Sequence, residues 1–281
     1  MTPSMQLLEA VTRAAREATG LIPVMAVEFE FYLHGNGDIA GFTALMERAM
    51  REHGIATFPL EKERGNAQYE YAVKHLPDPV KIARDTETLK RLIVENAVKS
   101  LFEPDFRAKP IQIEPGSGVH VHVSLIDGQG RNHFFREGKE YSPLLVNAVG
   151  GMLHHLPASM VHFAPYAESY ARFAKNGFNV PTTISWGANN RTVAVRLPDG
   201  PAEDKHIEHR VTGADADIAE AMAAVLAAAV DGIARSLTPN EKMYGNAHEE
   251  KYQRPPLPGS LEEARALAGG SPLMAYHSMV G

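Results

Sequence analysis

The sequence contains no cysteine, which excludes disulfide frameworks and thiolate metal sites. It also has no stretch that approaches about 18 uninterrupted apolar residues, so no membrane span is expected. Residues 1–20 carry charges throughout and lack the apolar core of a signal peptide. These absences make a cytoplasmic location the default expectation.

An excess of basic charge is absent as well. The chain has 28 Lys and Arg against 34 Asp and Glu, a formal net charge of -6 at pH 7. This balance leaves no basic footprint for nucleic acid, although acidic groups can still gather around cations. With 281 residues, of which 44% are hydrophobic, the chain can bury a core of real size, and we expect residues 1–281 to form a single domain.

Hydrophobic spacing predicts a mixture of helices and strands. Gly54 closes one predicted helix, the pair Gly150–Gly151 weakens another, and a nearly all-apolar helix is expected to be buried. This irregular mixture favours one α+β domain with a largely antiparallel sheet. The predicted helices cover residues 4–18, 42–54, 86–103, 142–160, 217–237 and 260–268, and the predicted strands cover 24–33, 66–73, 119–125, 181–187 and 191–198.

The segment "GSGVHVHVSL" (116–125) alternates imidazole and valine as a strand does. Alternation places His120, His122 and Ser124 on one face and the intervening valines on the other. The valines are expected to enter the core, and the glycines allow a close approach of backbone to substrate. The polar face is therefore free to bind something.

Carboxylates repeat the same pattern on other strands. Glu28 and Glu30 share a face in "VEFEFYL", and Gln68 and Glu70 share one in "NAQYEYAV". A polar strand face is commonly just solvated, but several such strands with a histidine strand predict a divalent metal site. Each close carboxylate pair costs about 4 kcal/mol at 4 Å with an effective dielectric of 20, so cations must compensate. Oxygen-rich ligation with one imidazole suits Mg²⁺ or Mn²⁺.

A series of motifs resembles the catalytic domain of the glutamine synthetase family over about residues 4–268. "SWGANNRT" resembles the γ-glutamyl-amine ligase branch, similar to γ-glutamylpolyamine synthetases, more than the ammonia-using members. The resemblance implies a glutamine synthetase/guanidino kinase-like fold, with a curved, largely antiparallel sheet flanked by helices. The series is "EFEFYL", "E-x4-Q-Y-E" (63–70), "KP" (109–110), "GSGVHVHVSL", "SWGANNRTVAVRLP" and "IEHRVTGADAD".

The resemblance implies two bound ions, Mg²⁺ or Mn²⁺, and ATP as a co-substrate. The first ion, beside the amino-acid substrate, would be held by Glu30, Glu63 and Glu70, although Glu61 is a neighbour of Glu63. The second ion, at the ATP phosphates, would be held by Glu28, His120 and Glu208.

The remaining implied residues bind substrates. Arg191 and Arg196 are five positions apart, so both can serve one site only if a loop or bulge occurs at Arg191. Arginine suits these positions because its planar fork grips carboxylate and phosphate oxygens in two places. The resemblance assigns His122, Ser124, Arg191 and Arg196 to ATP, Gly116, Arg172, Arg191 and Arg210 to the amino-acid substrate, and Arg191, Arg210 and Asn179 to catalysis.

Three positions depart from the family pattern. Asn179 stands in "GFNVP" where ammonia-using members carry a flap glutamate, and an amide cannot hold an ammonium by charge or take its proton. This favours an amine other than free ammonia, although members of the amine branch also lack that glutamate. Pro115 stands where many members have Asn, which loses an amide contact to the substrate amino acid, and Ile218 replaces an Asn-Pro continuation.

The family reaction implies an ATP-dependent carboxylate–amine ligase that forms a γ-glutamyl or related amide through an acyl phosphate. From the span of the resemblance, we expect the chain to consist of the catalytic domain without the family's N-terminal β-grasp domain and its usual last helices. One alternative is therefore a catalytically silent or split subunit that needs a separately encoded β-grasp partner. Another is a carboxylate or guanidino phosphotransferase. A homo-oligomer is expected, and neither nucleic acid nor membrane is an expected partner.

Overall fold

The computed structural model describes residues 1–138, 140–174, 179–252 and 254–277. Its strands form one open sheet in the order β2-β3-β1-β5-β8-β7-β6, with β4 paired to β1. The pairings are antiparallel except that of β6 with β7. The sheet is therefore largely antiparallel, as predicted. The strands are β1 (Ile22–His34), β2 (Glu61–Lys62), β3 (Gln68–Leu76), β4 (Glu103–Asp105), β5 (Val119–Ile126), β6 (Trp186–Ala188), β7 (Val195–Leu197) and β8 (Ile207–His209).

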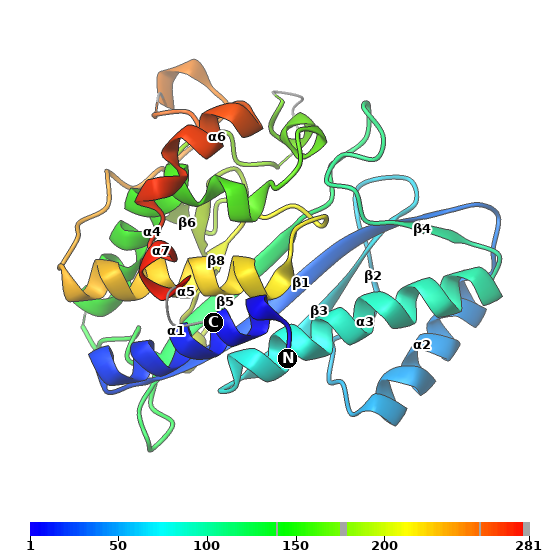
Figure 1. The fold of residues 1–281 in the computed structure, drawn as a ribbon, viewed down its shortest axis with the longest axis horizontal. Coiled ribbons are helices and arrows are strands. Elements are labelled where there is room, and N and C mark those ends of the chain that lie inside the picture. Colours follow the sequence, from blue (N-terminus) through cyan, green and yellow to red (C-terminus); the bar gives the residue numbers. More distant parts are fainter. Residues whose placement is uncertain (139, 175–178, 253, 278–281) are drawn as a thin grey trace.

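Helices pack on the sheet face opposite the carboxylates. Val27, Phe29 and Phe31 of β1 point into the core, where they join apolar side chains of α3 and α5. In Figure 1, α1, α3 and α5 lie side by side along the sheet, and α4 and α6 lie beyond α5 on the side away from α1. The helices are α1 (Pro3–Thr19), α2 (Ile39–His53), α3 (Pro79–Lys99), α4 (Pro143–Phe163), α5 (Ile218–Ala234), α6 (Leu261–Leu267) and α7 (Met274–His277).

Helices α4 and α5 approach each other closely, and glycine is the reason. Helix α4 runs unbroken through the glycine pair that weakens its sequence pattern. A Cβ on Gly151 would meet the backbone of Gly232 at 2.6 Å, and the backbones of the two helices touch there. By length and composition α4 could cross a membrane, but 61% of the relevant window is buried inside the protein, which marks it as a core helix.

The predicted strand 181–187 is largely wrong. Only β6 forms, from Trp186, because the preceding residues pair with a distant segment instead: the amide of Ile184 donates to the carbonyl of Pro255, and the amide of Leu257 donates to that of Thr182. The predicted strand 191–198 shortens to β7. Arg191 lies in the turn before β7, as its spacing from Arg196 requires.

Helix α3 begins seven residues before its predicted start, at Pro79 rather than at 86. The side chain of Asp78 accepts a hydrogen bond from the amide of Lys81, and proline occupies the first turn, a strong start signal that the apolar spacing missed. The helix ends at Lys99 because Leu101 adopts a positive φ of 63°. The short strand β4, which follows, and helix α7 were not predicted.

Candidate active site

Strand pairing brings the predicted polar residues onto one sheet face. Glu28 pairs with His120 across β1 and β5, and Glu30 pairs with Glu70 across β1 and β3. His122 pairs with Glu208 of β8. Since paired residues in adjacent strands point to the same side, these side chains form one continuous polar surface.

Glu30, Glu63 and Glu70 come together as the resemblance implies. Each offers a carboxylate oxygen, and the three oxygens lie within 4.8 Å of one another. Burial, followed by repulsion from neighbouring carboxylates, raises the pKa of Glu70 to about 10 and also raises the pKa of Glu63. The neighbouring Glu61 is exposed and lies outside this group. Such a crowded set of oxygens fits a hard divalent cation, whose charge would relieve the repulsion.

His120 links the second predicted set. Its Nδ1 lies 2.8 Å from Oε2 of Glu28 and 3.6 Å from Oε1 of Glu208. His122 also reaches Glu28, with Nε2 3.3 Å from Oε1. Burial would raise the pKa of Glu28, but His122 and His120 outweigh it and hold that pKa below its usual range. Among the converging ligand atoms, Glu28 and Glu208 group with His122, and Glu28 and Glu70 group with His120, so both imidazoles border the predicted set. Two carboxylates with an imidazole fit Mg²⁺ or Mn²⁺.

Two arginines neutralise Glu208, whose side chain is fully buried. Arg196 donates from Nη1 to Oε2 at 2.7 Å, and Arg210 donates to Oε1. Burial alone would raise the pKa of Glu208, but Arg210 leads the groups that lower it, to about 2. Both arginines are thus fixed beside the carboxylates, while Asn189 accepts a second hydrogen bond from Arg196 at 2.6 Å.

The predicted amino-acid subsite is a pocket at the Glu30 end of the face. Arg172, Arg191 and Arg210 line it together with Gly116 and Asn179. Arg172 is 2% exposed and donates to the carbonyls of Val211 and Arg210, at 2.7 and 3.3 Å. All the predicted substrate and catalytic residues therefore border one pocket, although their roles remain predictions.

The glycines of "GSG" leave room for the side chain of Arg172. A Cβ on Gly116 would lie 2.8 Å from Cγ of Arg172, and a Cβ on Gly118 would run into the guanidinium of the same arginine. The amide of Gly118 donates to Oε2 of Glu30 at 2.6 Å. The close approach that these glycines permit is to Arg172, while their contact with substrate stays a prediction.

The predicted ATP contacts lie further along the same face. His122 and Arg196 line a second pocket that shares Glu63, Glu70 and Arg191 with the first. Ser124 lines a third and more open pocket, which borders the second at Phe58 and His75. The three pockets therefore adjoin along one sheet face, from the buried carboxylates to an open cavity. This arrangement suits an acid at the carboxylate end and a nucleotide at the open end.

The sequence analysis did not identify two residues of this region, Gln68 and His75, as site residues. Gln68 donates from Nε2 to Glu30 and to the carbonyl of Gly116, at 3.4 and 3.1 Å, and its Oε1 accepts from the amide of Gly65. Its shared face with Glu70 was the available signal. His75 lies beside His122, with ring centroids 5.6 Å apart, but it is beyond the predicted strand 66–73, and continued alternation would place it on the opposite face.

A face that gathers carboxylates, imidazoles and arginines has the chemistry found in proteins that act on phosphoryl groups with divalent cations. The model of the glutamine synthetase catalytic domain matches residues 39–275. The chain belongs to the glutamine synthetase family.

Its relatives include enzymes that use amines. It is 32% identical to γ-glutamylputrescine synthetase PuuA of Escherichia coli (strain K12), covering 88% of this chain and 58% of that protein. It is 30% identical to glutamate–isopropylamine ligase of a Pseudomonas species, covering 95% and 64% respectively. The chain thus spans about three fifths of the length of these relatives.

Solved structures show the same fold. The complex of GmaS with ADP superposes with a TM-score of 0.84 at 23% identity, over 99% of this chain and 72% of that one. GmaS without ligand gives a TM-score of 0.80 at 26% identity with the same coverage. The glutamine synthetase catalytic fold and the resemblance to the amine-using branch are confirmed.

Proposed function

We propose that this protein is an ATP-dependent ligase that joins the γ-carboxylate of glutamate, or of a related amino acid, to an amine. The observation that carries the proposal is one sheet face on which two adjoining sets of metal-ligand side chains are bordered by Arg172, Arg191, Arg196 and Arg210. Relatives named as γ-glutamylputrescine synthetase and glutamate–isopropylamine ligase support it.

The chain's own residues provide positioning and charge. Arg172 and Arg210 border the buried pocket, where their forks suit the carboxylates of an amino acid. Arg191 borders both this pocket and the next, so it can contact a phosphoryl group passing between them. Mg²⁺ or Mn²⁺ at Glu30–Glu63–Glu70 and at Glu28–His120–Glu208 would neutralise phosphate charge.

The chemistry balances in two steps. A γ-carboxylate oxygen attacks the terminal phosphorus of ATP, ADP leaves, and an acyl phosphate forms. The amine nitrogen then attacks the acyl carbon, inorganic phosphate leaves, and the amine gives up one proton. Asn179, whose carbonyl accepts from Arg210 at 3.4 Å, brings no negative charge to hold an ammonium ion, which favours an amine other than ammonia.

A phosphate-release assay tests this function. The full chain with ATP, Mg²⁺ or Mn²⁺, glutamate and a panel of amines should release phosphate only when acid and amine are both present. Glu30→Gln should abolish release, whereas Glu95→Gln, an exposed change on α3, should not. Formation of ADP with acid alone would instead identify a phosphotransferase.

The alternative is a silent or split subunit that needs a β-grasp partner. In that case the chain alone should bind metal and nucleotide tightly without turnover. Adding a β-grasp polypeptide should then produce turnover. A homo-oligomeric assembly and a cytoplasmic location also remain predictions, which light scattering and cell fractionation would check.

A further inference from the structure

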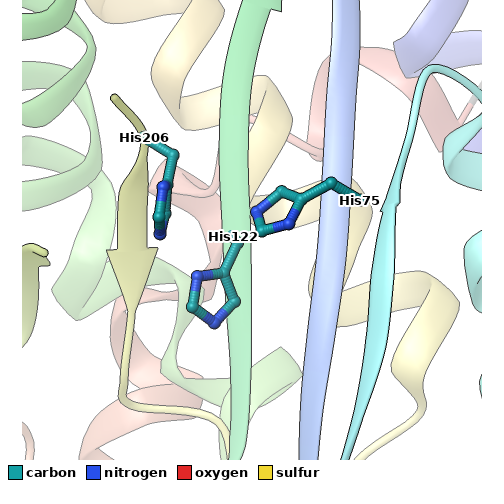
Figure 2. A group of neighbouring side chains, drawn as sticks. All are labelled: His75, His122 and His206. Carbon is teal, nitrogen blue, oxygen red and sulfur yellow. The ribbon is translucent and has the colours of Figure 1, made fainter. Parts of the chain in front are cut away.

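Three histidines gather at the nucleotide end of the same sheet face. His75 comes from β3, His122 from β5, and His206 immediately precedes β8; Figure 2 shows their rings converging. The ring centroids are 5.1 to 5.6 Å apart. Each ring offers one nitrogen, and the three nitrogens lie within 4.8 Å of one another.

A β-bulge creates this group. The register of β3 against β1 shifts between Met25 and Val27, so β3 has one extra residue opposite Ala26. The extra residue turns His75 onto the face that carries the carboxylates. Ala26 pairs with His122 on its other side, and its small methyl group lets the two rings meet across β1.

Hydrogen bonding leaves ring nitrogens available. Nδ1 of His206 lies 2.6 Å from the carbonyl oxygen of Asp204, which can only accept, so Nδ1 donates and Nε2 keeps a lone pair. Nε2 of His122 faces Glu28 at 3.3 Å, and both ring nitrogens of His122 are buried without a hydrogen bond among the described residues. A histidine that directs its second nitrogen to a carbonyl or carboxylate is the usual arrangement in metal sites.

We propose that His75, His122 and His206 form a Zn²⁺ site, which adjoins the Mg²⁺ or Mn²⁺ sites of the carboxylates at His122. Three imidazoles without an anionic ligand favour zinc over magnesium or manganese. Tetrahedral zinc with bonds of about 2.0–2.1 Å needs nitrogens roughly 3.4 Å apart. Rotation of the exposed His75 side chain can close that gap. His75 and His206 line the open cavity, which gives the ion an entry path and leaves room for a fourth ligand.

Calorimetric titration of the full chain with Zn²⁺ tests the site, in excess Mg²⁺ to occupy the carboxylates and without ATP, acid or amine. We expect one Zn²⁺ per chain, and with Co²⁺ the strong visible absorption of a low-coordinate imidazole site. His75→Ala and His206→Ala should each weaken Zn²⁺ binding by about tenfold or more. His53→Ala, an exposed histidine at the end of α2, is the matched control and should change nothing.

Equal Zn²⁺ affinity and stoichiometry in the wild type and both variants would overturn the proposal, as would a weak octahedral Co²⁺ spectrum. Unchanged Mn²⁺ binding in both variants shows that they are folded. Because no substrate is present, the result is independent of the ligase reaction, and failure of one proposal leaves the other testable.

Discussion

At the scale of single residues, Glu70 is the most informative carboxylate. Burial and four neighbouring carboxylates raise its pKa to about 10, so without a cation it is protonated at neutral pH. Glu70→Gln has nearly the same shape and should leave the fold intact, but it removes a proposed ligand. Loss of a residue that only hydrogen-bonds to a metal ligand lowers metal affinity by about 10–100-fold. Loss of a ligand itself should lower the Mn²⁺ affinity, measured by electron paramagnetic resonance, by at least that much.

The matched control is Glu61→Gln. Glu61 pairs with Glu70 across β2 and β3 yet is exposed and lies outside the group of converging oxygens. Its replacement should leave Mn²⁺ affinity unchanged. An equal loss in both variants would mean that general negative charge, rather than ligation by Glu70, attracts the ion.

Glu208 should matter to folding even without metal. It is fully buried and compensates the buried Arg210 and the partly exposed Arg196, so Glu208→Gln leaves both guanidinium groups without this counter-charge. Breaking such a pair from one side costs about 3–5 kcal/mol of unfolding free energy, measurable by urea denaturation. Glu52→Gln removes an exposed Glu–Arg pair on α2 and should have no measurable effect. If Glu208→Gln lowers the unfolding free energy no more than Glu52→Gln does, the buried position assigned to Glu208 is contradicted.

At the scale of elements, the contact of α4 with α5 depends on glycine. Gly151→Ala places a methyl group against the backbone of Gly232, where no flexible side chain can move aside. Overpacking of this kind costs about 1–3 kcal/mol. Thermal or urea denaturation should show the loss. Gly269→Ala is the control and should not lose stability, because its methyl group meets nothing within 4 Å. Equal stability of both variants would refute the close packing of α4 against α5.

A second interelement contact should respond to pH. Glu220 of α5 accepts from His162 of α4 at 2.6 Å, and this hydrogen bond is the main reason that the pKa of Glu220 lies below its ordinary 4.5. A carboxylate with a lowered folded-state pKa stabilises the fold above pH 4.5, and that stability is lost as the pH falls through the folded value. Urea midpoints between pH 7 and 3 should therefore fall more steeply in the wild type than in Glu220→Gln. Parallel slopes would contradict this.

Strand alternation accounts for what the sequence could predict at this scale. It correctly placed Glu28, Glu30 and His120 on one face because β1 and β5 are regular in that region. It gives no signal for His75, which lies beyond the predicted strand 66–73 and reaches this face only through a bulge that adds a residue to β3. The convergence of Glu63 with Glu30 came from the family resemblance, since Glu63 lies outside the regular strands and no period fixes its direction.

Long-range pairing explains the failures between residues 181 and 194. Their β-like composition is real, but the hydrogen bonds of Thr182 and Ile184 go to residues 255–257, a Pro-rich segment that no local pattern identifies as a partner. The position of Arg191 was predictable because its spacing from Arg196 is incompatible with a continuous strand serving one site. Spacing thus predicts where a regular strand must end, but not which distant segment takes its hydrogen bonds.

At the scale of the whole molecule, the carboxylate face should couple metal binding to global stability. Glu28, Glu30, Glu63 and Glu70 converge only when β1 and β3 are paired, so the unfolded chain offers no such site. An ion that binds only the folded state stabilises it by about 2.7 kcal/mol at 100 times its Kd. Mn²⁺ should therefore raise the Tm by several degrees in differential scanning calorimetry, and a chelator should reverse the rise. Glu70→Gln should lose much of this gain while keeping its metal-free Tm, because its neutral amide replaces a carboxyl that is already protonated without metal. A rise of the same size in that variant would show that Mn²⁺ stabilises the protein at a site other than these converging strands.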